Sequence, residues 1–117
     1  MEIVGKYKEE YNKQLNINLP IDDIYQSDGL IKHIQKQHKG FESYMSDIPD
    51  IIENPDYIGV NPKEPDSVEL IKVLKDNILV AVKLDKKNNY LYVASLYDIS
   101  NAKLQNRLNS GRIKAYK

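Results

Sequence analysis

The chain contains two histidines, His33 and His38, in the stretch GLIKHIQKQH, and histidine is the side chain best suited to proton transfer near neutral pH. Because the chain has no cysteine, a thiol nucleophile, a disulfide and a cysteine-bound zinc are all excluded. A regular helix over residues 29 to 39 would place the two imidazoles about 140° apart around its axis. This separation argues against a shared metal site, for which an i,i+4 spacing is usual.

The same helical geometry gives the two histidines different surroundings. Leu30, Ile31 and Ile34 define an apolar stripe, with His38 close to its middle and His33 at its flank. His33 is therefore the better candidate for a catalytic residue. For His38, whose position is near the middle of the stripe, a structural role competes more strongly with a catalytic one. The alternative is that His33 is only solvated and that His38 is a helix-end histidine favoured by the helix dipole.

Further polar side chains are predicted on one face of a three-stranded antiparallel meander. The segments SVELIKVL, ILVAVKL and YLYVASLY are rich in β-branched and aromatic residues, and the turn sequences KDN and DKKNN separate them. The first segment also fits a helical stripe. With a five-residue loop and a two-residue turn, one face carries Lys72, Ala81, Lys83, Leu91, Val93, Ser95 and Tyr97. The alternative is that these polar groups form only the solvated side of an amphipathic sheet.

The remaining elements are short. Capping residues in SDG and a stop at Gly40 bound the helix over 29 to 39, and FESYMSDIPDIIENP predicts a second helix with Asp47 as cap and Pro49 in its first turn. DYIGVNPKEPD reads as a strand and a loop, and SNAKLQNRLNSG as a brief C-terminal helix that closes at Gly111. Residues 3 to 19 lack a helical apolar period and predict a loose strand or hairpin.

Length and charge restrict the class of protein. The 117 residues, 41% of them apolar, are enough for one domain with a single modest core. Lysine plus arginine and aspartate plus glutamate are each 17, so any contact with RNA must be local. We find neither the pattern of a signal peptide nor an apolar run near the roughly 20 residues that span a bilayer, and we expect a soluble, cytoplasmic protein without membrane contact.

The order of HIQKQH on a helix, IPDIIENPDYI after it, LVAVKL on a strand and then YVASLYD resembles the phage-borne branch of the barnase, EndoU, colicin and RelE-like ribonuclease superfamily. The resemblance runs from about Ile24 to about Arg107. It implies an α+β fold in which N-terminal helices pack on a curved antiparallel sheet, with a short C-terminal helix. We therefore expect a single domain over residues 1 to 117, made of an N-terminal segment (1 to 23) and a nuclease-like core (24 to 117).

The resemblance also implies an activity. Similar enzymes are metal-independent endoribonucleases without cofactors, and they often act as toxins on tRNA or on translating RNA. In phage genomes such domains sit on or beside head-morphogenesis proteins and are thought to enter the host cytoplasm with the DNA. The implied partners are an RNA substrate, with tRNA as one candidate, a phage head or portal-associated protein, and an inhibitor protein.

Carried over by position, the helix histidines of the family match His33 and His38, its strand hydroxyl matches Ser95 and its sheet lysine matches Lys72. Such chemistry needs a base for the ribose 2'-OH, an acid for the leaving 5'-oxygen and groups that stabilise charge on phosphorus. The expected roles are acid or base for His33, partner or positioning residue for His38, phosphate cation for Lys72 and hydrogen-bond donor for Ser95. The product would be a 2',3'-cyclic phosphate.

Three further residues are expected to bind substrate. Tyr97 can stack on a base or donate to phosphate, Lys83 shares the predicted face, and Arg107 matches a C-terminal basic residue of the family.

Two other functions remain open. A non-catalytic protein-binding module of a phage or mobile element would have the same fold with a degenerate site, and the zero net charge favours it. A small immunity-type inhibitor would be preferred if the histidines and lysines lay on separate faces. A ribonuclease requires His33, His38, Lys72 and Ser95 to converge within about 10 Å on one face.

Overall fold

The computed structural model describes residues 1 to 116, and these form an open mixed sheet of seven strands in the order β1-β2-β6-β5-β4-β3-β7. The α+β fold class predicted from the sequence is confirmed. The strands are β1 (Glu2–Lys6), β2 (Asp23–Gln26), β3 (Tyr57–Asn61), β4 (Glu64–Val73), β5 (Asn77–Asp85), β6 (Tyr90–Ile99) and β7 (Ile113–Ala115).

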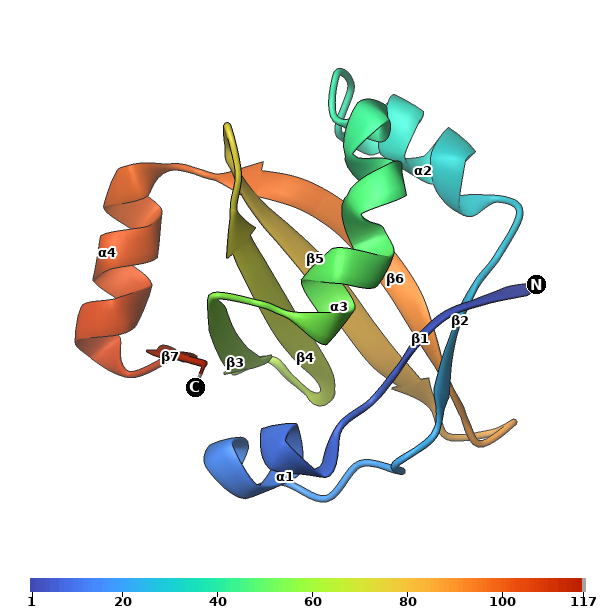
Figure 1. The fold of residues 1–117 in the computed structure, drawn as a ribbon, viewed down its shortest axis with the longest axis horizontal. Helices are drawn as coiled ribbons and strands as arrows, with labels where there is room; N and C mark the ends of the chain where they lie inside the picture. The colour runs from blue at the N-terminus through green and yellow to red at the C-terminus, as the bar shows by residue number, and fades with distance from the viewer. Residues whose placement is uncertain (117) are drawn as a thin grey trace.

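Helices pack on both faces and at one edge of the sheet (Figure 1). They are α1 (Glu9–Leu15), α2 (Leu30–Gln37), the 3-10 helix η1 (Glu42–Asp47), α3 (Ile48–Glu53) and α4 (Asn101–Ser110). In the view of Figure 1, α3 crosses in front of the sheet, and α2 and α4 lie at opposite sides of it. No helix within residues 1 to 116 is long and apolar enough to cross a membrane.

Strands β3 to β6 are successive antiparallel neighbours, so the predicted meander is confirmed and its first segment is a strand. The sheet is not wholly antiparallel, because β2 pairs parallel with β6. That pairing is short and joins only Ile24 to Leu91 and Tyr25 to Tyr92. Beyond it, α2 packs beside β6. Helix α2 can therefore bring side chains to the second half of β6.

Each face of the sheet has its own apolar core. The smaller core, on the α4 side, contains Ile71, Leu79, Ile99 and Ile113 with Leu104 and Leu108 of α4 packed on it. The larger core lies under α2 and α3, and each of its aliphatic side chains contributes about 1.5–3 kcal/mol when fully buried. Its members include Ile24, Ile34, Ile48, Ile51, Ile52, Ile58, Val68, Leu70, Ile78, Val80, Val82, Leu91, Val93 and Leu96.

The predicted register of the meander is wrong at both turns. Tyr90 pairs with Asp85, so the loop has four residues rather than five, and Val73 pairs with Asn77, so the turn has three residues rather than two. Strand β6 also carries a bulge at residue 94, which shifts its later residues by one position. As a result Ala81, Lys83, Ser95 and Tyr97 do share one face, as predicted. The other three predicted members, Lys72, Leu91 and Val93, lie on the opposite face.

The N-terminal segment was predicted only in part. β1 is a strand, but residues 9 to 15 form α1, a helix that the sequence did not predict. Its buried side chains are Tyr11 and Asn12, so no aliphatic stripe marks it. The amide of Asn12 holds the turn after the helix, since it accepts from the Tyr7 hydroxyl at 2.9 Å and donates to the Leu19 carbonyl at 2.7 Å.

Candidate active site

His33 and Ser95 meet at the edge of β6. The stripe of α2 buries Leu30 and Ile34 in the larger core, and His33 at the flank of that stripe stays exposed. From there the His33 Nε2 atom reaches to 3.3 Å from the Ser95 Oγ atom. The two residues are separated by 62 positions in the chain, so this contact is a product of the fold.

His38 joins them because α2 ends one residue before it. With φ −137° and ψ 54°, His38 leaves the helical path, and its ring centroid lies 6.0 Å from that of His33. The prediction that the two imidazoles diverge by about 140° is therefore wrong, since it assumed a regular helix to residue 39. Nor does His38 enter the apolar core. Its ring stacks on Tyr97 instead, with the centroids 5.0 Å apart and the planes at 24°.

The surroundings of His38 favour its neutral form. Partial burial lowers the pKa of His38, and the adjacent His33 lowers it further, while the Asp98 carboxylate raises it. The net effect on this pKa is downward from the ordinary value. A neutral imidazole can accept a proton, so His38 is suited to act as a base near neutral pH.

A row of three residues runs across the sheet from Ser95 on β6 through Ala81 on β5 to Glu69 on β4. At about 4.8 Å between neighbouring strands, Glu69 and Ser95 have backbones roughly 10 Å apart. The only side chain between them in this row is the methyl group of Ala81. A group bound beside Ser95 could therefore also approach the side chains that gather around Glu69.

Glu69 is 1% exposed, and two arginines surround its carboxylate. Arg112 makes a bidentate ion pair with it, with Nε to Oε1 at 3.1 Å and Nη2 to Oε2 at 2.8 Å. Arg107 of α4 approaches the same carboxylate with Nη1 at 3.9 Å. This Nη1 atom is buried and, within residues 1 to 116, has no hydrogen-bond partner. Two guanidinium groups beside one buried carboxylate leave one positive charge in excess. A buried N–H group without a hydrogen-bond acceptor lowers the stability of the fold unless a ligand supplies the acceptor.

Tyr97 connects the arginines to the histidines. Burial raises the pKa of the Tyr97 hydroxyl and Glu69 adds to the rise, while Arg107 and Arg112 act in the opposite direction. The hydroxyl therefore stays protonated at neutral pH and can donate a hydrogen bond. The structure thus brings together five of the seven residues predicted for the site, namely His33, His38, Ser95, Tyr97 and Arg107.

Two predicted site lysines are engaged elsewhere. Lys72 lies on the opposite face, where Nζ donates to the Asn54 carbonyl at 2.7 Å and lies 3.6 Å from Asp50. Lys83 is on the site face but its Nζ pairs with Glu64 at 2.6 Å. Convergence within one site therefore holds for both histidines and Ser95, and fails for Lys72.

Glu69 and Arg112 were missed from the sequence. A glutamate inside the apolar strand SVELIKVL was a usable signal, because a carboxylate at a buried strand position needs a cationic partner. Nothing in the local sequence pointed to Arg112 as that partner, since it follows α4 and lies 43 positions away.

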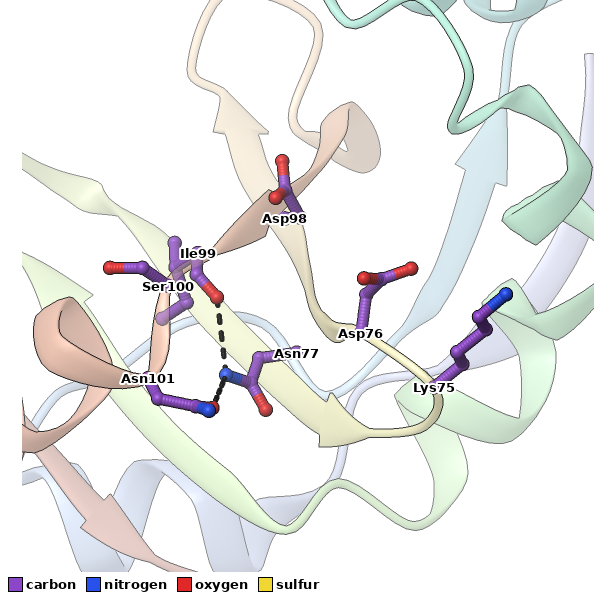
Figure 2. A pocket seen from close by; sticks show the side chains of 7 residues that line it. All are labelled: Lys75, Asp76, Asn77, Asp98, Ile99, Ser100 and Asn101. Carbon is purple, nitrogen blue, oxygen red and sulfur yellow. Dashed lines mark hydrogen bonds between the residues drawn. The ribbon is translucent and has the colours of Figure 1, made fainter.

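A polar pocket lies where β5 begins and β6 ends, and none of the predicted site residues lines it (Figure 2). The Asn77 amide closes it on one side, donating to the Ile99 carbonyl at 3.1 Å and to Asn101 Oδ1 at 2.7 Å. The charged side chains at this pocket are one lysine and two aspartates, which do not favour a polyanion. Its lining residues are Lys75, Asp76, Asn77, Asp98, Ile99, Ser100 and Asn101.

Imidazoles beside a hydroxyl and a guanidinium, on one face of an α+β sheet, form a site of the acid–base and anion-binding type. A family model described as phage-Barnase-EndoU-ColicinE5/D-RelE like nuclease3 matches residues 2–106, and the chain belongs to this family of phage nuclease-like domains. The resemblance predicted from the sequence is confirmed and extends further, to include β1 and α1. Comparison with curated proteins and with solved structures found no match.

Proposed function

We propose that the protein is an endoribonuclease that cleaves RNA by attack of a ribose 2'-OH on the adjacent phosphate. The observation that carries this proposal is the contact of His33 with Ser95, with His38 adjacent, on the face that also holds Arg107. Membership of a nuclease-like family supports cleavage of a phosphodiester. The site supplies acid–base groups, and RNA carries its own nucleophile, so this reaction needs no metal-bound water.

We assign the base to His38 and the acid to His33. His38 is neutral near neutral pH and takes the proton from the 2'-OH as the 2'-oxygen bonds to phosphorus. The bond from phosphorus to the 5'-oxygen breaks, and this oxygen takes a proton from His33. His33 Nε2 lies beside Ser95, the hydroxyl proposed to bind the phosphate, and this position suits a donor to the leaving oxygen. The products are a 2',3'-cyclic phosphate and a free 5'-hydroxyl.

Charge on the phosphoryl oxygens requires donors. Ser95 Oγ donates one hydrogen bond, and Arg107 provides a cation whose Nη1 atom has no hydrogen-bond partner among residues 1 to 116. The bidentate pair of Glu69 with Arg112 fixes the carboxylate that Arg107 approaches. Arg107 thus takes the role of phosphate cation that the sequence had suggested for Lys72.

The test is incubation of the purified protein with total tRNA in the presence of a chelator. Wild type is expected to cleave and to leave 2',3'-cyclic phosphate ends, and His33→Ala and His38→Ala are expected to lose at least 100-fold in rate, as is usual for an acid or base. Lys72→Ala is the matched control, because this lysine lies on the opposite face, and it should cleave at the wild-type rate.

Three results would contradict the proposal. One is the absence of cleavage of tRNA and of unstructured RNA by the wild-type protein. Another is equal cleavage by wild type and His33→Ala. The third is cleavage of an RNA whose 2'-OH at the scissile position has been replaced by hydrogen.

A further inference from the structure

Three tyrosines form a connected cluster on the sheet beside the site, and the proposed mechanism does not use them. The rings of Tyr25 and Tyr90 meet edge to face with their centroids 6.0 Å apart. The rings of Tyr90 and Tyr92 are tilted by 45° relative to each other, with their centroids 5.8 Å apart. All three are only partly buried. We call Tyr25, Tyr90 and Tyr92 the tyrosine platform.

Strand register places the platform on the same face as Ser95. Tyr25 pairs with Tyr92, while their preceding neighbours Ile24 and Leu91 pair with each other and lie in the larger core on the opposite face. Tyr92 also pairs with Lys83, a member of the site face. At 3.3 Å per residue, Tyr92 and Ser95 lie roughly 10 Å apart along β6.

The platform differs from the tyrosines that stabilise the fold. The hydroxyls of Tyr7, Tyr11 and Tyr44 each bond to a protein acceptor. Within residues 1 to 116, the hydroxyls of the platform have no such bond. Three adjacent aromatic rings with free hydroxyls on the surface of a sheet are costly to leave in water, and they present flat faces and donors to a ligand.

The charge near the platform suits a nucleic acid strand. Lys86 and Lys87 lie in the turn that leads directly into Tyr90, and both are exposed. Lys86 pairs with Asp66 at 3.0 Å but remains 73% exposed. On the other side of the site, α2 carries Lys32 and Lys36 with no acidic residue among residues 29 to 40. Lysines thus flank the platform and line the helix beside the site, while Asp85, which pairs with Tyr90 in the strand register, places a carboxylate next to the platform.

We propose that the tyrosine platform stacks unpaired bases of the RNA on one side of the cleaved phosphate. Successive aromatic rings next to cations are the usual means of holding a single strand, and each stacked base adds about 1–3 kcal/mol. This inference rests on the proposed function and specifies its substrate as single-stranded RNA that extends past the cleavage point. A dinucleotide would reach the histidines but would not cover the platform.

The experiment compares cleavage of a dinucleotide, a single-stranded hexanucleotide and the same hexanucleotide in a duplex. Wild type should cleave the single-stranded hexamer with the highest kcat/KM. Tyr92→Leu and Tyr90→Leu should each lower kcat/KM for the hexamer about 10-fold and leave the dinucleotide unchanged. Tyr92→Phe is the matched control, because it keeps the ring, and it should behave as wild type. Thermal melting of each variant verifies that it folds.

Binding is measured separately with a hexamer that carries a 2'-deoxy sugar at the cleavage point, by fluorescence anisotropy. Weaker binding by Tyr92→Leu but not by Tyr92→Phe supports the platform even if the wild-type protein cleaves no RNA, in which case only the proposed function fails. Equal binding and equal hexamer cleavage by wild type and both leucine variants would overturn the platform, and would indicate that these rings serve a protein partner instead. If wild-type protein neither binds nor cleaves any of the RNAs, both proposals fail.

Discussion

At the scale of single residues, the position of His38 determines the pH at which the site can work. A base must be unprotonated, so kcat/KM rises as pH passes through the pKa of the base in the free enzyme. This rise in kcat/KM is the acidic limb of the pH profile. Because burial and His33 lower the pKa of His38, we expect the acidic limb to lie below about pH 6.5.

Asp98 is the neighbouring charge that opposes this shift. Its carboxylate stabilises the imidazolium form of His38, so Asp98→Asn should lower the pKa of His38 further and move the acidic limb to lower pH. The measurement is kcat/KM for RNA cleavage from pH 4.5 to 8. A limb that moves upward in Asp98→Asn, or stays in place, would remove His38 from the role of base.

Ser95 should act through its hydroxyl. Ser95→Ala removes a donor aimed at the phosphate, and loss of one such donor commonly lowers kcat by about 100-fold to 1,000-fold. Ser95→Thr keeps a hydroxyl and should retain much more activity. Both variants should melt close to wild type, since Ser95 is partly exposed. Full activity in Ser95→Ala would show that the contact with His33 is incidental.

Glu69 should affect stability as well as activity. Glu69→Gln leaves two partly buried arginines without their anion, and breaking such a pair costs about 3–5 kcal/mol. Urea denaturation measures this loss. Glu64→Gln is the control, because its pair with Lys83 is at the surface, with the side chains 33% and 48% exposed, and should contribute about 1 kcal/mol or less. Equal losses in the two variants would contradict the assignment of Glu69 as the buried anchor.

The family resemblance placed His33, His38 and Ser95 in one site, and the structure brings them together, whereas helical geometry alone separated the two imidazoles. Its choice of Lys72 was wrong, because the turn before β5 has three residues rather than two, and this odd shift in register places Lys72 on the opposite face. The arginines depend on contacts between distant segments, and residue type alone does not say which cation will reach a site.

At the scale of elements, β7 positions Arg112 and depends on close contact with β3. Gly59 of β3 pairs with Ile113 of β7, and a Cβ atom on Gly59 would lie 2.3 Å from the Arg112 carbonyl oxygen. The main chain at this point cannot move without separating the strands. The absence of a side chain at Gly59 thus allows the close approach of β3 and β7 that keeps Arg112 beside Glu69.

Gly59→Ala should therefore displace β7 and weaken the pair of Arg112 with Glu69. We expect a loss of about 1–3 kcal/mol in unfolding free energy, as for other overpacked sites, together with lower cleavage activity. Gly29→Ala is the control, since a Cβ there meets nothing within 4 Å. Urea denaturation and the tRNA assay measure the two effects, and a fully stable, fully active Gly59→Ala would contradict this role for β7.

Local patterns predicted the meander, α3 and α4 well, because alternation, Pro49 and the Ser100 cap act within a few residues. Helix α1 was not predicted, because tyrosine and asparagine rather than aliphatic residues occupy its buried positions. The sequence also did not predict the bulge in β6 or the parallel pairing of β2 with β6, because packing between distant segments determines both. The bulge matters most for function, since it aligns Ser95 with Ala81.

At the scale of the whole molecule, a net charge of zero limits how strongly salt can affect binding. We expect only two or three phosphate contacts, and for single strands each contributes a slope of about −0.7 in a plot of log affinity against log salt. The slope for the non-cleavable hexamer should therefore be about −2 between 50 and 200 mM salt. Lys36→Gln should change this slope by less than the roughly 0.7 that one phosphate contact contributes. A slope steeper than about −5 would indicate a much larger electrostatic interface.

The sheet order brings distant parts of the polypeptide together, because β2 lies beside β6 and His33 meets a serine 62 positions later. Contacts between such distant residues form late in folding, since a long loop must close first. During synthesis, the imidazoles leave the ribosome well before the strand that completes the site. A chain under translation therefore has no assembled site until β6 has emerged, so the proposed cleavage cannot begin before that strand has left the ribosome.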